Sequence, residues 1–279
     1  HIGYHKTFKE YRDTKKIVFD SLSKNSFALI NKDDRNSVYM VQNSKANIHT
    51  YSLKSKSNFS CRIIEQQLDG MLLSIDNSEI WTKLVGKFNA SNILAIYSVG
   101  MIYNLDKINL LTAISSLESV IGRFQSFLSS NKVTVIIDYA HTPDAIENVI
   151  STINNIKKSN QNLITVIGCG GDRDKDKRPI MGKISSDLSS RVIFTSDNPR
   201  SEDPQSIIND MVQGVSNFNN DKVFIEVERK KAIKQAKENS VKGDIVLIAG
   251  KGHEDYQELN NNERIYFDDF KIAKEIFNK

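Results

Sequence analysis

One short polar segment has the side-chain types needed to recognise an amino acid. Residues 196–203 read SDNPRSED and follow an apolar run. Asp197 can accept hydrogen bonds from an ammonium group, Asn198 can donate or accept, and the planar guanidinium of Arg200 matches a carboxylate through two N–H groups. An amino-acid ligand fits this inventory. The alternative is an Asx-type turn with an exposed arginine, and spacing alone leaves both interpretations open.

Two glycine-rich segments could bring the backbone close to a ligand. Residues 168–173 read GCGGDR, and three glycines in four residues are conformationally costly unless their freedom is used. Arg173 is the candidate side chain there, and a solvated charged loop is the alternative. In AGKGHED, Glu254 follows Gly250 and a second glycine, so its carboxylate could hold another ammonium group. A plain turn is the alternative for that segment.

An acid and an imidazole follow another apolar run, in the segment DYAHTPD. Thr142 fits a helix N-cap and Pro143 the first helical position, so these two residues need no further function. Asp138 and His141 stand at a strand end beside a helix N-terminus, where they suit contacts with a nucleotide ribose and base. Spacing alone gives the functional and the structural interpretation equal weight.

The positions of these segments depend on the fold expected after residue 122. A hairpin, RFQSFL then VTVIID, precedes strictly alternating helices and strands. The expected strands are NLITVIG, RVIFTS, KVFIEV and DIVLIAG, and the helices begin near Thr142, Pro179, Asp203, Glu228 and Asp268. This alternation predicts a mostly parallel, Rossmann-like sheet covered by helices on both faces. The polar segments at the strand ends should then converge on one edge.

The first part of the chain predicts a different domain. Short segments with β-branched and aromatic residues predict the strands of a mixed sheet, among them SFALIN, SVYMVQ, NIHTYSL, FSCRIIEQQ, GMLLSID and EIWTKLV. Helical spacing follows between residues 89 and 117, and Asn89 fits the N-cap of the first of two helices. We therefore expect an α/β protein with domains at residues 1–121 and 122–279.

Composition narrows the class of protein. The chain has 279 residues, two cysteines and a formal net charge of +4, with basic and acidic residues interleaved. Interleaved charges do not favour nucleic-acid binding, and two cysteines cannot form a disulfide scaffold. No apolar run approaches the roughly 18 residues of a membrane-spanning helix, and the first residues lack the apolar stretch of a secretory signal. We expect a cytoplasmic protein that binds neither nucleic acid nor membrane.

Taken together and in this order, the segments resemble the Mur ligases. The sequences DYAHTPDAIENV, GCGGDRDKDKRPIMG, DNPRSEDPQSIINDM and AGKGHEDYQ are similar to motifs of that family. Upstream, GKFNASN is similar to its G-x-F-N-x-x-N motif, GRF to its interdomain motif, and HIGYHKTFKEYRDTK to a segment that ends in a carbamylated lysine. The arginine of DNPR resembles the branch that adds meso-diaminopimelate, whose second carboxylate needs a fixed cation.

The resemblance implies ATP-dependent amide formation in peptidoglycan synthesis. The implied substrates are UDP-MurNAc-L-Ala-D-Glu and meso-diaminopimelate, with an acyl phosphate intermediate and a requirement for Mg²⁺. It implies that carbamylated Lys15 positions magnesium beside His1 as a metal ligand. The implied ATP-contacting residues are Asn89, Arg123, Asp138 and His141. The implied meso-diaminopimelate site comprises Arg173, Asp197, Asn198, Pro199, Arg200, Gly250 and Glu254.

The chain departs from the family pattern in two places. Gly3 stands where the family usually has an aspartate, and no G-x-x-x-x-G-K-[ST] phosphate loop occurs in the 279 residues. Because the phosphate loop is missing, we expect the chain to be the later part of a longer ligase and to be inactive alone. We also expect it to be a monomer. A catalytically inert binding module of the same fold is the alternative. An NAD- or SAM-dependent enzyme rests on fold analogy only.

Overall fold

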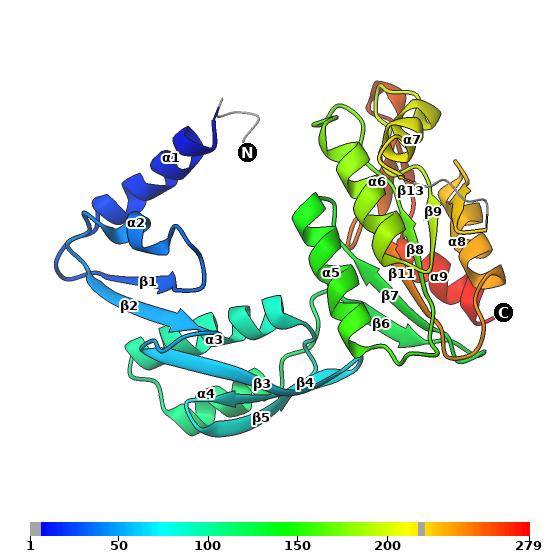
Figure 1. Ribbon diagram of the computed structural model, residues 1–279. Helices are drawn as coiled ribbons and strands as arrows, with labels where there is room; N and C mark the ends of the chain where they lie inside the picture. Colours follow the sequence, from blue (N-terminus) through cyan, green and yellow to red (C-terminus); the bar gives the residue numbers. More distant parts are fainter. Residues whose placement is uncertain (1–6, 217–220) are drawn as a thin grey trace. The chain divides into compact units, whose positions relative to one another are not determined.

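The computed structural model describes residues 7–216 and 221–279, and the chain divides into two compact units, His1–Glu118 and Ser119–Lys279. Figure 1 shows the elements of each unit. The division into family domains after residue 121 remains a prediction. Within the described ranges, no helix combines the length and the apolar character needed to cross a membrane.

The first unit contains a five-stranded mixed sheet, as predicted. In spatial order its strands are β1 (Phe27–Asn31), β2 (Asn47–Ser52), β3 (Phe59–Gln67), β4 (Gly70–Ile75) and β5 (Ser78–Thr82). The β1–β2 and β2–β3 pairs are parallel, and the β3–β4 and β4–β5 pairs are antiparallel. Asp76 and Asn77 both have positive φ and form the two-residue turn between β4 and β5.

One predicted strand of this unit is a helix. The segment SVYMVQ was expected to be extended, but it forms α2 (Ser37–Val41). Because β1 and β2 are parallel, the chain between them has to cross back along the sheet, and a helical turn provides this crossover. Val41 is buried and Val38 is exposed, so the β-branched residues that suggested a strand occupy two sides of a short helix.

Helix α3 (Lys87–Ile102) packs its buried residues against the sheet. The N-cap of this helix is Gly86, so the prediction that Asn89 caps it is wrong. Gly86 has a φ of +100°, which glycine adopts readily. Asn89 lies inside the first turn, where its Nδ2 donates to the carbonyl oxygen of Val85 at 2.8 Å. The other helices of the unit are α1 (Phe8–Asp20) and α4 (Lys107–Ser115).

The second unit contains the predicted Rossmann-like sheet. Its strands are β6 (Gln125–Leu128), β7 (Thr134–Asp138), β8 (Leu163–Ile167), β9 (Arg191–Phe194), β10 (Val223–Ile225) and β11 (Ile245–Ala249). Their spatial order is β10-β9-β8-β11-β7-β6. β6 pairs antiparallel with β7, and the other neighbouring pairs are parallel.

Helices cover both faces of this sheet. They are α5 (Pro143–Ile156), α6 (Lys177–Leu188), α7 (Pro204–Val212), α8 (Arg229–Glu238) and α9 (Asp269–Phe277). Thr142 caps α5 as predicted. The predicted helix starts at Asp203 and Asp268 are the N-caps of α7 and α9, whereas α6 begins at Lys177, before the predicted Pro179. α5, α6 and α7 pack side by side, and α8 packs with α9 (Figure 1).

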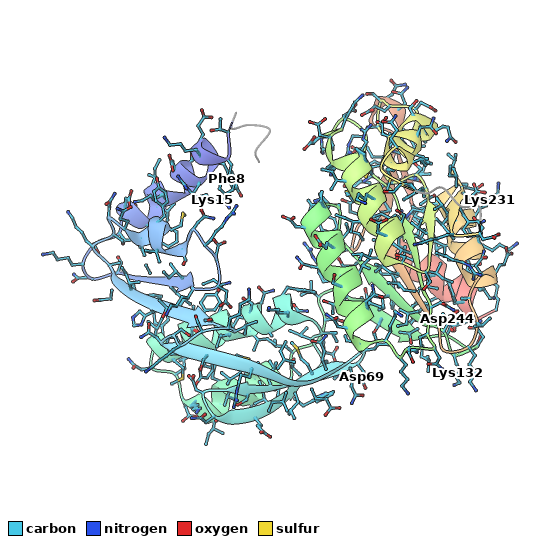
Figure 2. The ribbon with its side chains drawn as sticks, in the orientation of Figure 1. Phe8, Lys15, Asp69, Lys132, Lys231 and Asp244 are labelled. Carbon is cyan, nitrogen blue, oxygen red and sulfur yellow. The ribbon has the colours of Figure 1, made fainter. Side chains whose placement is uncertain are left out.

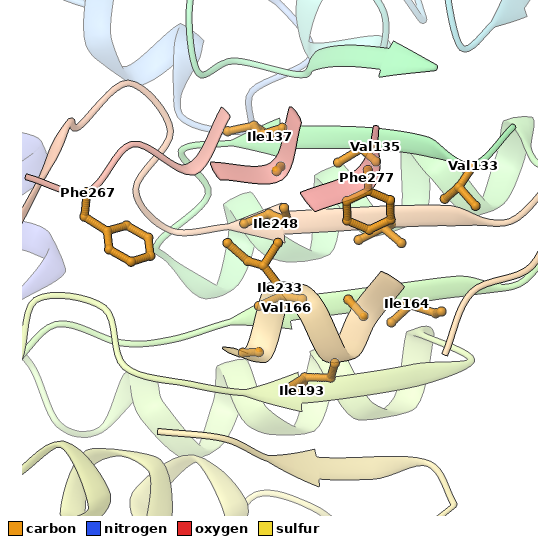
Figure 3. Packing of buried hydrophobic residues seen from close by; sticks show 14 residues of the cluster. Val133, Val135, Ile137, Ile164, Val166, Ile193, Ile233, Ile248, Phe267 and Phe277 are labelled. Carbon is orange, nitrogen blue, oxygen red and sulfur yellow. The ribbon is translucent and has the colours of Figure 1, made fainter. Parts of the chain in front are cut away.

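Apolar packing holds the strands of the second unit in place (Figure 3). Ile137, Val166 and Ile248 come from three neighbouring strands and belong to one buried cluster with Ile233 of α8 and Phe277 of α9. Every residue of β8 and β11 is buried, because helices cover the sheet on both faces. The loops that leave the strand ends therefore start from strands that are packed on both faces.

The strand order brings the predicted polar segments together. The parallel strands β9, β8, β11 and β7 are consecutive in space, so the loops after their carboxyl ends are neighbours. β11 inserts between β7 and β8, which makes this edge a topological switch point, where ligands bind in open α/β sheets. A hairpin of β12 (Tyr256–Glu258) and β13 (Arg264–Tyr266) follows β11 and contributes to the same edge.

Candidate active site

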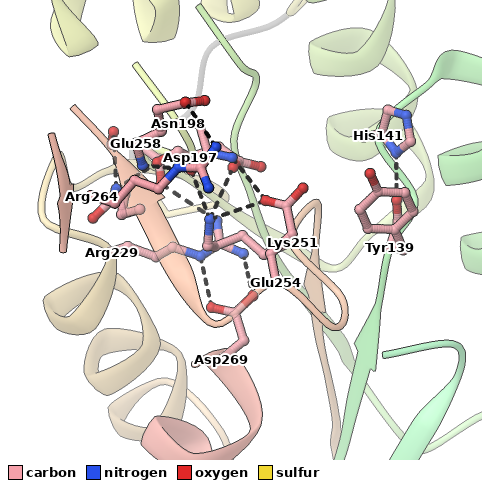
Figure 4. Close-up of polar contacts among 12 residues, drawn as sticks. Tyr139, His141, Asp197, Asn198, Arg229, Lys251, Glu254, Glu258, Arg264 and Asp269 are labelled. Carbon is pink, nitrogen blue, oxygen red and sulfur yellow. Dashed lines mark hydrogen bonds and ion pairs between the residues drawn. The ribbon is translucent and has the colours of Figure 1, made fainter. Parts of the chain in front are cut away.

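Asn198 lies at the centre of a polar network at this edge (Figure 4). Its Nδ2 donates to Glu254 Oε2 at 2.8 Å. Its Oδ1 accepts from Lys251 Nζ at 2.9 Å and from the backbone N–H of Glu258 at 3.0 Å. Asn198 is buried, and these three partners from two other segments fix the orientation of its amide.

Asp197, Lys251 and Glu254 form what we call the acidic group. The Lys251 ammonium lies 3.4 Å from Glu254 Oε2 and 3.6 Å from Asp197 Oδ1, and the lysine side chain is completely buried. A buried ammonium is stable only beside compensating charge. With two carboxylates around one ammonium, the group carries a formal net charge of −1.

Arg200, Glu258 and Arg264 form what we call the basic group. Glu258 Oε2 accepts from Arg200 Nε at 2.8 Å, and its Oε1 lies 3.3 Å from Arg264 Nη2. Burial tends to raise the pKa of Glu258, but the hydrogen bond from Arg264 and the charge of Arg200 lower it below its ordinary value. Glu258 is therefore ionised at neutral pH, and the basic group carries one net positive charge.

Two glycines make the close packing of these groups possible. Gly250 has φ +118°, and a Cβ there would lie 2.5 Å from Asp197 Oδ2. A Cβ on Gly170 would lie 2.9 Å from Arg200 Nη1 and 3.8 Å from Arg173 Cγ. Any larger residue would displace charged side chains, which accounts for the glycines at these two positions. The Arg173 side chain is exposed on the same loop and donates to the carbonyl oxygen of Asp172.

A buried arginine anchors the loop that carries Arg173. Arg178 is fully buried at the start of α6 and pairs with Glu202 at 2.7 Å and Asp210 at 2.9 Å. Glu202 also accepts the backbone N–H of Asp172 at 2.7 Å. The hydrogen bond from Arg178 is the main cause that lowers the pKa of Glu202 from its ordinary 4.5 to about 2. Glu202 thus fixes the glycine-rich loop through its charge.

We expect Glu202 to make the free energy of unfolding decrease as the pH is lowered. Because the pKa of Glu202 is lowered on folding, its contribution is complete above the unfolded value of 4.5 and is lost as pH falls towards about 2. Urea unfolding from about pH 7 to about pH 3 should therefore show a smaller loss of unfolding free energy for Glu202→Gln than for the wild type. Equal losses would contradict this role.

Arg123, Asp138 and His141 lie together on the β7 side of the edge. Asp138 is buried and accepts the backbone N–H groups of Phe124 and Ala140, both at 2.8 Å, so part of its role is structural. Burial raises the pKa of Asp138 even though these bonds and Arg123 oppose it. His141 and Arg123 both contact the Tyr139 ring, with the ring centroids of Tyr139 and His141 4.5 Å apart.

A buried ion pair lies beside the acidic group and joins two helices to the end of β11. Arg229 and Asp269 are both completely buried and form two hydrogen bonds of 2.8 and 2.7 Å (Figure 4). Arg229 Nη2 also donates to the carbonyl oxygen of Ala249, at the end of β11, at 3.0 Å. The pair therefore connects α8 and α9 to the strand end from which the acidic group projects.

In the first unit, the two adjacent lysines of α1 differ in their surroundings. Lys15 is exposed, and its Nζ lies 4.7 Å from the centroid of the Tyr11 ring (Figure 2). Lys16 is buried and pairs with Asp20. No ion pair of Lys15 is found among the residues that the structure describes. His1 lies outside the described residues. In residues 7–216 and 221–279, no three His, Cys, Asp or Glu side chains are grouped for metal binding.

Three members of the network were not predicted from the sequence. Lys251 stands between Gly250 and a second glycine of a segment already singled out, so its position offered a signal. Glu258 and Arg264 belong to a hairpin whose strands have three residues each and gave no recognisable pattern. The cross-strand pairing of Glu258 with Arg264 becomes visible only in the folded unit.

Two family models match the chain. The model "Mur ligase middle domain" matches residues 1–100, and "Mur ligase, glutamate ligase domain" matches residues 122–252. Together they account for most of the sequence.

Curated relatives match along the entire chain. The UDP-N-acetylmuramoyl-L-alanyl-D-glutamate--2,6-diaminopimelate ligase of Bacteroides thetaiotaomicron is 47% identical over 278 residues, which cover 100% of this chain and 58% of the relative. The ligase of the same name from Bacillus cereus is 36% identical over 285 residues, covering 99% of this chain and 57% of the relative. The chain thus spans less than two thirds of these relatives.

Solved structures agree with this fold. A structure of UDP-N-acetylmuramoyl-L-alanyl-D-glutamate--2,6-diaminopimelate ligase matches with a TM-score of 0.61 and 34% identity, over 98% of this chain and 57% of that one. MurF ligase from Thermotoga maritima in complex with ADP matches with a TM-score of 0.68 and 16% identity, over 98% and 57% of the two chains. At that identity the second match shows the fold alone.

Proposed function

The chain belongs to the Mur ligase family, and on that premise we propose that it is part of a cytoplasmic, ATP-dependent ligase that joins meso-diaminopimelate to UDP-MurNAc-L-Ala-D-Glu in peptidoglycan synthesis. The observation that carries this proposal is the pair of oppositely charged groups on either side of Asn198. The acidic group lacks one cation and the basic group lacks one anion. The ammonium and carboxylate of one amino-acid centre would neutralise both.

The choice of meso-diaminopimelate follows from the basic group. Meso-diaminopimelate differs from lysine by a second carboxylate on the distal carbon, next to the distal amine. Arg200 would pair with that carboxylate, while Asp197 and Glu254 would hold the distal ammonium. When the α-amine of lysine takes the place of the reacting amine, its distal end brings an ammonium but no carboxylate, so the net positive charge of the basic group would stay unpaired. A site built to pair a charge rejects a ligand that lacks it.

The proposed reaction has two steps. The γ-carboxylate of the D-glutamate attacks the γ-phosphorus of ATP, so that ADP leaves and an acyl phosphate forms. The free amine of meso-diaminopimelate then attacks the acyl carbon, phosphate leaves, and the nitrogen loses a proton as the amide forms. Positioning and charge neutralisation dominate such transfers. We assign the nucleotide contacts to Asn89, Arg123, Asp138 and His141, and we include Arg173 and Pro199 in the amino-acid site.

The residues present are compatible with Mg²⁺ bound mainly through phosphate oxygens. Magnesium in ATP-dependent enzymes often takes one or two protein carboxylates and otherwise water and substrate phosphates, so a three-residue cluster is not needed. A carbamate on Lys15 would supply such an oxygen ligand, and the exposed Lys15 amine is accessible to CO₂. Bound there, the ion would neutralise charge on the transferred phosphoryl group. His1 remains the proposed neighbouring ligand.

We expect Lys15, and not Lys16, to carry the carbamate. Carbamate formation requires an amine that CO₂ can reach, and the Lys16 side chain is buried and paired with Asp20. Incubation of the chain with ¹³C-bicarbonate should give one carbamate carbon resonance that disappears in Lys15→Ala. Lys16→Met should retain the resonance. Loss of the signal in Lys16→Met alone would refute the assignment.

An activity assay tests the proposed function. The chain is fused behind the preceding part of the Bacteroides thetaiotaomicron relative, because it spans 58% of that protein's length. Phosphate release should then require ATP, UDP-MurNAc-L-Ala-D-Glu and meso-diaminopimelate together. The 279-residue chain alone should be inactive, because it contains no phosphate loop. A fusion that binds meso-diaminopimelate without turnover would instead favour the inert binding module.

A further inference from the structure

We propose that Glu258 is a positioning residue that holds the guanidinium of Arg200 in the orientation that recognises a second carboxylate. Glu258 would thereby set the preference for a diacid over lysine. This inference deepens the proposed function and rests on it. Glu258 lies on the β12–β13 hairpin, outside every segment that the sequence analysis singled out.

Glu258 contacts both the backbone and the side chain of Arg200. The carbonyl oxygen of Glu258 accepts the backbone N–H of Arg200 at 3.1 Å, and its Oε2 accepts Arg200 Nε at 2.8 Å. Arg200 has φ +52°, a left-handed conformation that an L-residue other than glycine rarely adopts. Such a conformation persists only where neighbouring contacts determine it, and Glu258 supplies two of them.

These contacts leave a defined part of the guanidinium available. Of its five N–H groups, Nε–H is bonded to Glu258 and one N–H of Nη1 is bonded to the carbonyl oxygen of Gly171 at 2.8 Å. The remaining three N–H groups all belong to the two terminal nitrogens. A carboxylate can therefore approach the terminal end of Arg200, while the Nε side is occupied.

Glu258 is itself fixed by its neighbours. Its backbone N–H donates to Asn198 Oδ1 at 3.0 Å, and its side chain is only 14% exposed. Arg264 is its cross-strand partner and contacts the second carboxylate oxygen. The preceding residue of β12, Gln257, donates to the carbonyl oxygen of Asp197 at 2.6 Å. Four hydrogen bonds thus join the hairpin to the segment 197–200, and the two that Arg200 donates to Glu258 orient the arginine.

The test is an NMR titration of the 279-residue chain with meso-diaminopimelate and, separately, with lysine. Glu258→Ala should weaken meso-diaminopimelate binding about 10-fold or more and lysine binding less than about 2-fold, because a free Arg200 has to be ordered on binding. Glu258→Gln keeps an oxygen acceptor for Nε and should retain affinity within about 3-fold of wild type. Glu263→Ala removes an exposed carboxylate from the same hairpin and is the matched control, with no expected change.

A double variant separates positioning from general damage to the unit. If Glu258 acts through Arg200, Glu258→Ala should add less than about 2-fold to the loss in Arg200→Ala. An undiminished effect in that background, an unchanged diacid preference in Glu258→Ala, or a loss in Glu258→Gln as large as in Glu258→Ala would each overturn the inference.

The ligand-free protein distinguishes failure of this inference from failure of the proposed function. Hydrogen exchange at Arg200 Nε–H should be slow in wild type and Glu258→Gln and faster in Glu258→Ala, whatever the ligand. A wild-type chain with slow exchange but no preference for meso-diaminopimelate would refute the proposed function while supporting the positioning by Glu258. Fast exchange in the wild type would refute the positioning itself.

Discussion

Replacing Arg200 by alanine is expected to weaken meso-diaminopimelate binding about 100-fold or more while changing lysine binding less than about 3-fold. The variant removes the cation that would pair with the distal carboxylate. Glu258 would then face that carboxylate with only Arg264 as its partner, so the basic group would lose its net positive charge. The loss is selective for ligands bound with their reacting amine away from Arg200, because the distal end of lysine carries an ammonium but no carboxylate that could pair with Arg200.

Titration of wild type and Arg200→Ala with both amino acids measures this effect. Lys183→Ala is the control, because Lys183 is an exposed cation of the same unit that pairs with Asp187 on α6. It should leave both affinities unchanged. If Arg200→Ala weakened the binding of lysine and of meso-diaminopimelate equally, the arginine would support the loop without pairing with the second carboxylate.

Breaking the Arg229–Asp269 pair is expected to cost the second unit about 3–5 kcal/mol of unfolding free energy. Both side chains are completely buried, so Asp269→Asn or Arg229→Met leaves a charge without a partner in the interior. Burial by itself would lower the pKa of Arg229, but Asp269 raises it, so the arginine stays charged. The unit then has to unfold or admit water to solvate that charge.

Urea unfolding of the single variants and of the double variant Arg229→Met/Asp269→Leu tests this prediction. The double variant should recover most of the stability, because replacing both members of a buried pair by apolar residues is often neutral. Lys231→Ala breaks an exposed pair with Glu228 and should leave the unfolding free energy nearly unchanged. Single variants as stable as Lys231→Ala would contradict the account.

The fold was largely predictable because its pattern is local. Continuous apolar strands such as β8 and β11 and the helix starts at Thr142, Asp203 and Asp268 mark the elements of the second unit directly. The segment of α2 was misread because its β-branched residues favour a strand, whereas the parallel pairing around it requires a crossover. The strand preference of these residues is visible in the sequence, whereas the need for a crossover becomes visible only once the strand pairing is known.

The site was predictable only in part, because its charges are balanced by residues distant in sequence. Asp197, Asn198 and Arg200 share one segment and were identified by their chemistry. The partners that set their orientation, Lys251 and Glu258, come from 53 and 60 residues away from Asn198. Whether Arg173 and Pro199 contact a ligand remains a prediction, as do the nucleotide contacts.

A crystal structure of the chain with meso-diaminopimelate tests the central claim most directly. The account predicts that one end of the ligand bridges the two charged groups, with its carboxylate on the terminal nitrogens of Arg200 and its ammonium beside Asp197 and Glu254. A ligand bound elsewhere, or with its carboxylates away from Arg200 and both ammonium groups away from the acidic group, would contradict it.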